Sequence, residues 1–334
     1  MKNAILHILF LSFSISVIGQ DVHFSQFNKS YQNLNPALTG SFVGDFRFNG
    51  NFRNQWASIS EPFRTFSAAI DASHPFSKLP QFKVGLVFMN DEAGVGGLKN
   101  TAVNSNFGYE IKIDPDSTWI LKTGLQLGFS ARSINFDKFT YDNQYDGRAF
   151  DPNLTTGENF DQSSLVHLNL GTGFGLEHRL SNTDRIEIGF SAFNLTYPNL
   201  SFNKASARLD LRSNFYILSQ FQLSENLSLL PSLLFSNQAK FRELVIGSDL
   251  KYRFEGQSAF SNIYGGLYWR TGDAFIFSAG LDYDQWNLGL SYDVNYSQLR
   301  TASNRRGGLE ISLTYIFKKY IPNLRRYKIC PNFM

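Results

Sequence analysis

Apolar and polar residues alternate along most of this chain, and turn residues separate one alternating run from the next. The run at residues 119–132 is typical. Its apolar face carries Leu125, Leu127 and Phe129. Its polar face carries Lys122, Gln126 and Arg132. A period of two places successive side chains on opposite faces of a β-strand. The pattern therefore predicts a chain built from strands, each with one apolar and one polar face.

Counted in this way, the chain holds about fourteen strands, each near the ten residues with which a tilted strand crosses a bilayer. The cleanest segments are residues 45–56, 103–113, 119–132, 166–176, 209–223, 286–294 and 309–317. Weaker segments fill the gaps at residues 64–73, 82–90, 185–196, 227–235, 241–254, 263–270 and 274–283. Residues 227–235 are apolar on both faces, and Pro231 lacks a backbone donor, which predicts a bulge there.

The connections alternate in length, as in outer-membrane barrels. Short turns are expected at residues 114–117, 181–184, 224–226 and 282–284, and long loops at 57–63, 91–100, 133–164, 198–206 and 295–306. We therefore expect one transmembrane antiparallel β-barrel over residues 44–318, with the short turns and both termini in the periplasm. Trp119 and Trp286 would begin strands at the periplasmic rim, and Trp56 and Trp269 would end strands at the outer rim, as an aromatic girdle requires.

A soluble β-sandwich is the alternative, because it also uses alternating strands. Strand length, loop asymmetry and tryptophan placement favour the barrel. Composition agrees, since 16% of the residues are aromatic, with 33 Phe and 15 Tyr. The net charge of +3 comes from scattered Lys and Arg, so no nucleic-acid footprint is visible.

The first residues resemble an export signal. Lys2 precedes an apolar run at residues 4–18, and Val17 and Gly19 occupy the small-residue positions of a cleavage site. We expect a signal peptide at residues 1–19 and a mature chain that begins at Gln20 or Asp21; a buried N-terminal helix is the alternative. The one cysteine, Cys330, excludes an intramolecular disulfide.

Several short stretches, in order along nearly the whole mature chain, resemble the PorP/SprF family of outer-membrane proteins. They are residues 21–26 (DVHFSQ), 33–40 (NLNPALTG), 53–56 (RNQW), 90–94 (NDEAG), 198–202 (PNLSF), 230–233 (LPSL), 268–273 (YWRTGD), 289–293 (GLSYD), 308–311 (GLEI) and 330–333 (CPNF). The resemblance implies a barrel that works with type IX secretion components and with a secreted surface protein, such as an adhesin or gliding protein. It supplies no catalytic residues and no cofactor. The segment 133–164 matches least.

Two segments outside the expected strands carry the candidate binding residues. Residues 20–43 form an expected periplasmic segment, and its part at 21–39 is either a plug or packed lid for the barrel or a docking strap for a periplasmic partner. Its candidate contact residues are His23, Phe24, Gln26, Asn35 and Pro36. The basic tail at residues 319–334 is expected in the periplasm, either simply solvated or against an acidic partner.

The long loop at residues 133–164 carries aromatic residues in a polar setting. They are Phe136, Phe139, Tyr141, Tyr145 and Phe150. Aromatic residues in a polar exposed loop are typical interface anchors, although packing of the loop over the barrel mouth explains them equally well.

The sequence offers little for catalysis. His23 and Ser25 lie before the first strand, and no His, Asp or Glu spacing resembles a metal site. His167 is expected to face the lumen as a polar filler. Gly171, Gly173 and Gly175 share one strand face and are expected to leave space on the lumen wall. Our leading hypothesis is a non-enzymatic accessory barrel of type IX secretion without cofactors, and the alternative is a passive porin or small-molecule transporter.

Overall fold

The computed structural model describes residues 21–55, 61–94, 96–158, 161–203, 206–256, 259–297 and 303–318. The expected signal peptide, Trp56, the basic tail and Cys330 lie outside these residues. In the described part of the chain, no helix is long and apolar enough to cross a membrane.

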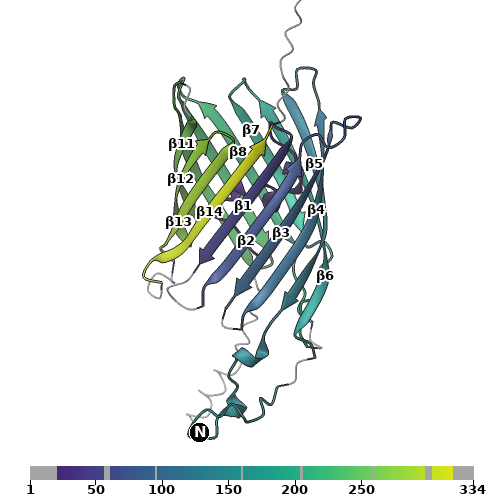
Figure 1. Cartoon of the computed structure of the whole chain (residues 1–334), viewed down its shortest axis with the longest axis vertical. Coiled ribbons are helices and arrows are strands. Elements are labelled where there is room, and N and C mark those ends of the chain that lie inside the picture. Colours follow the sequence, from purple (N-terminus) through teal and green to yellow (C-terminus); the bar gives the residue numbers. More distant parts are fainter. Residues whose placement is uncertain are drawn as a thin grey trace, which may run out of the picture.

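Fourteen antiparallel strands close into one barrel, in which each strand pairs with its neighbours in sequence and β1 pairs with β14 (Figure 1). The strands are β1 (Phe46–Gln55), β2 (Phe63–Ala72), β3 (Phe82–Ala93), β4 (Leu98–Lys112), β5 (Trp119–Ser133), β6 (Ser164–Arg179), β7 (Arg185–Phe193), β8 (Arg212–Gln222), β9 (Leu227–Gln238), β10 (Phe241–Arg253), β11 (Phe260–Arg270), β12 (Ala274–Tyr283), β13 (Trp286–Asn295) and β14 (Arg306–Phe317). The predicted barrel is confirmed.

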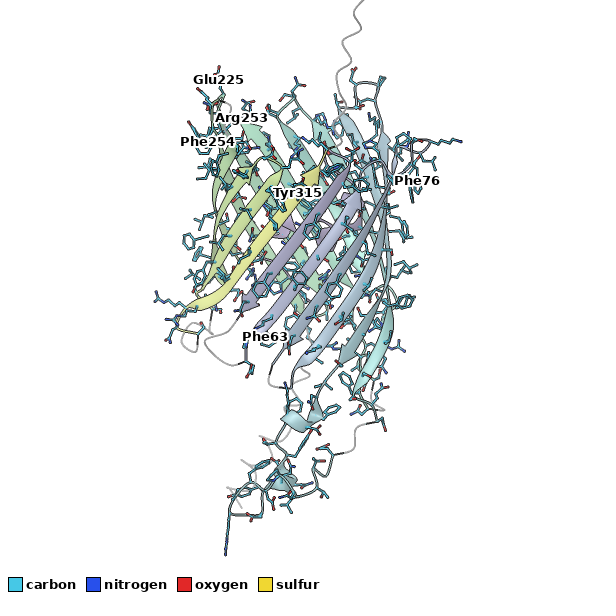
Figure 2. All side chains as sticks on the ribbon, viewed as in Figure 1. Phe63, Phe76, Glu225, Arg253, Phe254 and Tyr315 are labelled. Carbon is cyan, nitrogen blue, oxygen red and sulfur yellow. The ribbon has the colours of Figure 1, made fainter. Side chains whose placement is uncertain are left out.

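The alternation sets the two faces of the wall, as predicted. In β5, Leu125 is 47% exposed and Phe129 61% exposed, whereas Lys122 is 1% exposed. The exposed face of nearly every strand is aliphatic or aromatic, and Figure 2 shows these side chains standing away from the barrel. Such a surface is costly in water and suits lipid. Trp119, Trp286 and Trp269 are exposed near strand ends, as a girdle requires.

The two ends of the barrel differ. We call the end with the connections at residues 113–118, 180–184, 223–226 and 284–285 the short-turn end, and the end with residues 134–163 and 194–211 the long-loop end. The asymmetry is weaker than predicted. At the long-loop end β9 joins β10 through residues 239–240 alone, and β3 joins β4 through residues 94–97.

The predicted bulge at Pro231 is wrong. Pro231 lies opposite Ser248 in an unbroken register with β10, and its register with β8 is the same on either side of it. Register shifts occur instead between Phe260 and Asn262 of β11 and between Tyr292 and Val294 of β13. On the inner face of β9, Leu234 lies in an apolar cluster with the segment that fills the barrel.

Candidate functional site: a plugged lumen and its two mouths

Residues 21–42, which we call the plug, lie inside the barrel. The plug contains two short 3-10 turns, η1 (Phe27–Lys29) and η2 (Pro36–Leu38), and one helical turn, α2 (Tyr31–Leu34). Asn35 and Thr39 are completely buried, and Ala37 is 1% exposed. Ordered polar segments of this kind survive burial only when the wall satisfies their backbone groups.

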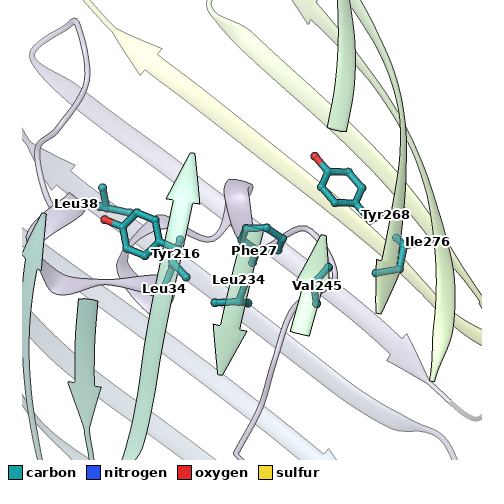
Figure 3. Packing of buried hydrophobic residues seen from close by; sticks show 8 residues of the cluster. All are labelled: Phe27, Leu34, Leu38, Tyr216, Leu234, Val245, Tyr268 and Ile276. Carbon is teal, nitrogen blue, oxygen red and sulfur yellow. The ribbon is translucent and has the colours of Figure 1, made fainter. Parts of the chain in front are cut away.

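An apolar cluster anchors the middle of the plug to one side of the wall. Phe27, Leu34 and Leu38 pack against inward side chains of β8 to β12, as Figure 3 shows. The wall residues in this cluster are Tyr216, Leu234, Val245, Tyr268 and Ile276. Leu234 is the member of this cluster that β9 contributes, so contact with the plug accounts for this inward leucine.

The wall at β5 and β6 accepts the plug because glycines leave it without side chains there. A Cβ at Gly124 of β5 would lie 2.2 Å from the Ala37 nitrogen, and one at Gly173 of β6 would overlap the Asn35 amide. The Asn35 side chain donates to the Phe174 carbonyl at 3.0 Å and to the Tyr216 hydroxyl at 3.2 Å. The prediction that Gly173 leaves space on the lumen wall is thereby confirmed.

Four charged wall residues, which we call the latch, hold the plug toward the long-loop end. They are Arg53, Arg270, Asp293 and Glu310. The backbone nitrogens of Ser25 and Gln26 donate to the Glu310 carboxylate at 2.7 and 3.0 Å. The Ser25 hydroxyl donates to Asp293 and accepts from both arginines. The buried charges of the latch are paired with one another and also form hydrogen bonds with the plug. Moving the plug would leave these charges without those hydrogen bonds, so the latch favours one position of the plug.

A separate ion pair holds the plug toward the short-turn end. Arg47 of β1 and Asp71 of β2 form a buried, bidentate ion pair, with the Arg47 Nη2 2.6 Å from the carboxylate. Arg47 also donates to the Leu38 carbonyl, and the Gly40 nitrogen donates to Asp71. The plug is therefore held at both ends and packed in the middle.

We expected the N-terminal segment in the periplasm, outside the barrel on the side of the short turns. In the structure the segment lies in the lumen as the plug. Asp21 donates from its backbone to Gln238 and accepts from Asn194, near the long-loop ends of β9 and β7, whereas Phe317 ends β14 at the other rim. The plug alternative is the one that the structure contains. The reason is complementarity: a polar, Asn- and Gln-rich segment finds donors and acceptors on the polar inner wall.

The candidate contact residues of this segment accordingly face the wall. Phe24, Gln26, Asn35 and Pro36 are buried in the lumen, and His23 is partly exposed with its Nε2 3.7 Å from Glu243. In this conformation they form no exposed docking strap. Ser25 bonds to the latch instead of to His23, so the pair lacks the geometry of a nucleophile and its base.

The aromatic residues of the long loop divide into two groups. Phe136 makes an edge contact with Phe202 of the neighbouring loop, a Cβ on Gly96 would strike the Phe139 ring, and the Tyr141 hydroxyl bonds to the Phe136 carbonyl. Tyr145 and Phe150 are instead 57% and 48% exposed. They pair across a small hairpin, Tyr145↔Phe150, in the part of the loop that extends away from the barrel in Figure 1.

Sequence reasoning missed the latch, although a signal for it was present. Each latch residue lies in one of the family-like stretches, namely RNQW, YWRTGD, GLSYD and GLEI, and each is a charge on the inward face of a strand. Their pairing was invisible because it joins β1 to β11, β13 and β14, which are close in the barrel but far apart in the sequence. His167 does face inward, as predicted. Among the described residues, no three His, Cys, Asp or Glu side chains form a group that could hold a metal ion.

A closed, lipid-faced barrel of this kind defines an outer-membrane β-barrel protein, and the comparisons with known proteins specify the family. The model of the type IX secretion system membrane protein PorP/SprF family matches residues 16–315, so the chain belongs to that family. No protein of curated function matches the chain.

Solved structures resemble the fold at low sequence identity. The CymD monoaromatic hydrocarbon channel has a TM-score of 0.53 at 9% identity, over 88% of this chain and 94% of that one. The Ralstonia pickettii toluene transporter TbuX has a TM-score of 0.49 at 9% identity, over 86% and 94%. A Pseudomonas aeruginosa FadL homologue has a TM-score of 0.48 at 11% identity, over 86% and 94%. At these identities the likeness concerns the barrel fold alone.

Proposed function

We propose that this protein is a non-enzymatic accessory barrel of type IX secretion, which binds protein partners at its mouths and supports export or surface anchoring of adhesins or gliding proteins. The observation that carries the proposal is the plugged lumen. A segment that is held at both ends and packed in the middle occupies much of the barrel axis. Binding chemistry is then left to the loops, where it commonly concentrates on rigid scaffolds.

The exposed hairpin of the long loop is the contact that we assign to the secreted partner. Tyr145 and Phe150 present two aromatic side chains beyond the barrel mouth, and exposed aromatic residues commonly anchor interfaces. Phe136, Phe139 and Tyr141 would support the loop by packing at its base.

Deletion of residues 142–159 tests this role. The strands remain complete, so the variant should insert as a folded barrel, while surface display of the secreted partner should fall. The matched control is the double variant Asp142→Ala/Asn143→Ala, which alters polar loop positions and keeps both aromatic anchors. Normal display after the deletion would refute the docking role.

The proposed orientation places the long-loop end outside the cell and the short-turn end in the periplasm. Single cysteines placed in residues 142–158 should then react with an impermeant maleimide on intact cells, and Cys330 should not. Labelling of Cys330 alone would reverse the orientation.

A passive porin or small-molecule transporter remains the second candidate function. A solute could cross the barrel only if the plug left the lumen. Ion conductance of the purified protein therefore distinguishes a transporter from a partner-binding barrel.

A further inference from the structure

The short-turn end holds two neighbouring cavities that the plug does not fill. The inner one, which we call the cup, measures about 380 Å³ and has the plug residues Lys29 and Tyr31 in its floor. The outer one measures about 690 Å³ and lies among the turns at residues 116–118 and 180–184. Arg185 and Gln220 line both cavities, so the two cavities share a border.

The carboxylates of the cup already have donors. Lys122 lies 2.6 and 2.7 Å from Glu177 and Glu187, and Glu177 also accepts from Arg179. Asp249 accepts from Asn28, Tyr268 and Ser278, and Asp282 accepts from Asn262, Tyr264 and Asn287. Their acceptor capacity is largely used within the wall, so they offer little to a cationic ligand.

Three cations of the cup, in contrast, have no acidic partner within salt-bridge distance among the described residues. They are Lys29, Arg185 and Lys251. The ammonium groups of Lys29 and Lys251 lie 4.9 and 5.7 Å from the centre of one ring, that of Tyr264. Among the described residues, the one hydrogen bond of the Lys29 ammonium goes to the neutral Asn287 amide at 2.9 Å.

Unpaired cations that are partly withdrawn from water gain much from an incoming anion. Lys29 and Lys251 are only partly exposed, and each ammonium carries three donors. Lys251 lies within electrostatic range of Asp282 and of three cations, Lys29, Arg185 and Arg253. Figure 2 shows Arg253 near the short-turn rim. Like charges held close together favour a ligand that brings several negative charges at once.

We propose that the short-turn mouth is a docking site for an acidic peptide segment of a periplasmic partner. The segment would enter beside Arg185, at the border of the two cavities, and place carboxylates in the cup against Arg185, Lys251 and Lys29. A peptide suits the shape, because the two neighbouring cavities together offer more room than one small anion needs. The proposal specifies the partner chemistry at one mouth, and its periplasmic location rests on the proposed orientation.

Binding of a labelled peptide to the purified full-length barrel in nanodiscs tests the proposal. The probe is an alternating Glu-Ser peptide of about ten residues, and its neutral control is the Gln-Ser peptide of the same length. The Glu-Ser peptide should bind more tightly, and its binding should weaken with salt because exposed charges are screened.

The triple variant Lys29→Gln/Arg185→Gln/Lys251→Gln should weaken binding of the Glu-Ser peptide at least about tenfold, since three ion contacts are lost. The control variant Lys99→Gln/Lys138→Gln/Arg148→Gln makes the same change of charge at exposed positions of the long-loop end and should leave binding unchanged. Equal affinity of both variants would overturn the proposal, as would equal binding of the Gln-Ser peptide. Selective displacement by inorganic phosphate at constant ionic strength would identify a small-anion site and would also overturn it.

This experiment is independent of secretion. Suppose that the loop deletion abolishes display of the secreted partner but the purified barrel does not bind the Glu-Ser peptide. The proposed function would then stand, and the acidic-peptide site would be rejected.

Discussion

At the scale of single residues, the lipid-facing positions are the simplest to test. Leu125 is central in β5, is 47% exposed and faces away from the lumen. Leu125→Arg should lower the free energy of unfolding by roughly 2–4 kcal/mol if the position lies near the bilayer midplane, because a charge must be accommodated in hydrocarbon.

The measurement is urea unfolding in lipid vesicles, and Leu125→Phe is the control that changes shape without adding charge. Gln126 is a poor control, since its side chain is buried and bonds to Asn106 beside the plug. A cost for arginine no larger than that for phenylalanine would show that the assigned register is wrong.

The latch makes a second prediction at this scale. Glu310 accepts the backbone N–H groups of Ser25 and Gln26, and it is completely buried. Hydrogen bonds to a charged acceptor contribute about 1.5–3 kcal/mol. Glu310→Ala should therefore speed hydrogen exchange of these two amides at least about tenfold.

Exchange followed by mass spectrometry of the peptide that contains Ser25 provides the readout. Glu92→Ala is the control, because Glu92 pairs with the exposed Lys99 and has no plug contact among the described interactions. Unchanged protection in Glu310→Ala would mean that packing alone holds this part of the plug.

At the scale of elements, hydrogen bonds within the turn between β4 and β5 stabilise its conformation. Asp114 accepts from the Thr118 hydroxyl and from the backbone N–H groups of Thr118 and Trp119. These hydrogen bonds, the one from the Thr118 hydroxyl foremost, lower the pKa of Asp114 from 3.8 to about 2. A lowered pKa stabilises the turn above pH about 4, and that contribution is lost as the pH falls toward 2.

Carboxyl titration by NMR should thus give a pKa near 2 for Asp114 in the intact protein. Thr118→Val should move the pKa upward toward its ordinary value, since the largest cause is removed. Ser117→Ala, next to it in the same turn, should leave the pKa unchanged. A normal pKa in the unmodified protein would contradict the observed turn geometry.

The strands were predictable because their signal is local. A period of two and turn residues between runs are visible without any knowledge of partners, and β5 and β13 begin where the sequence indicated. Strand ends were less certain: β8 begins at Arg212, because residues 209–211 belong to the preceding loop. The sequence of residues 21–42 did not show whether this segment lies inside or outside the barrel. A polar segment finds hydrogen-bond partners both in water and on a polar lumen wall.

The interior depends on contacts between distant parts of the sequence, and this is why the sequence revealed less of the site than of the fold. The Ser25–Glu310 bond joins positions 285 residues apart. Single-strand patterns place Glu310 on the inner face but do not show that Arg53 and the plug meet it there. The glycines of β6 were a better guide, because a missing side chain on an inner face implies something that needs the space.

At the scale of the whole molecule, the plug decides between the two proposed functions. The plug begins at Asp21, near the long-loop ends of β7 and β9, and its Gly40 lies beside the Arg47–Asp71 pair toward the short-turn end. A partner-binding barrel has no need to move it, whereas a porin must. In planar bilayers the intact protein should therefore show little conductance if our proposal is correct.

Deletion of residues 21–39 should open the barrel. The polar inner face of fourteen strands would then line a water-filled lumen, as in porins of similar construction, and stable ion conductance should result. A variant with Phe46→Leu, on the outer face, is the matched control and should conduct as little as the intact protein. Because the deletion also removes the apolar cluster around Phe27 and Leu34, the variant is expected to be less stable, and heat-modifiable electrophoresis must first show a folded barrel. A large conductance in the intact protein would make the transporter the better assignment, and a folded deletion variant that does not conduct would show that the wall side chains close the lumen without the plug.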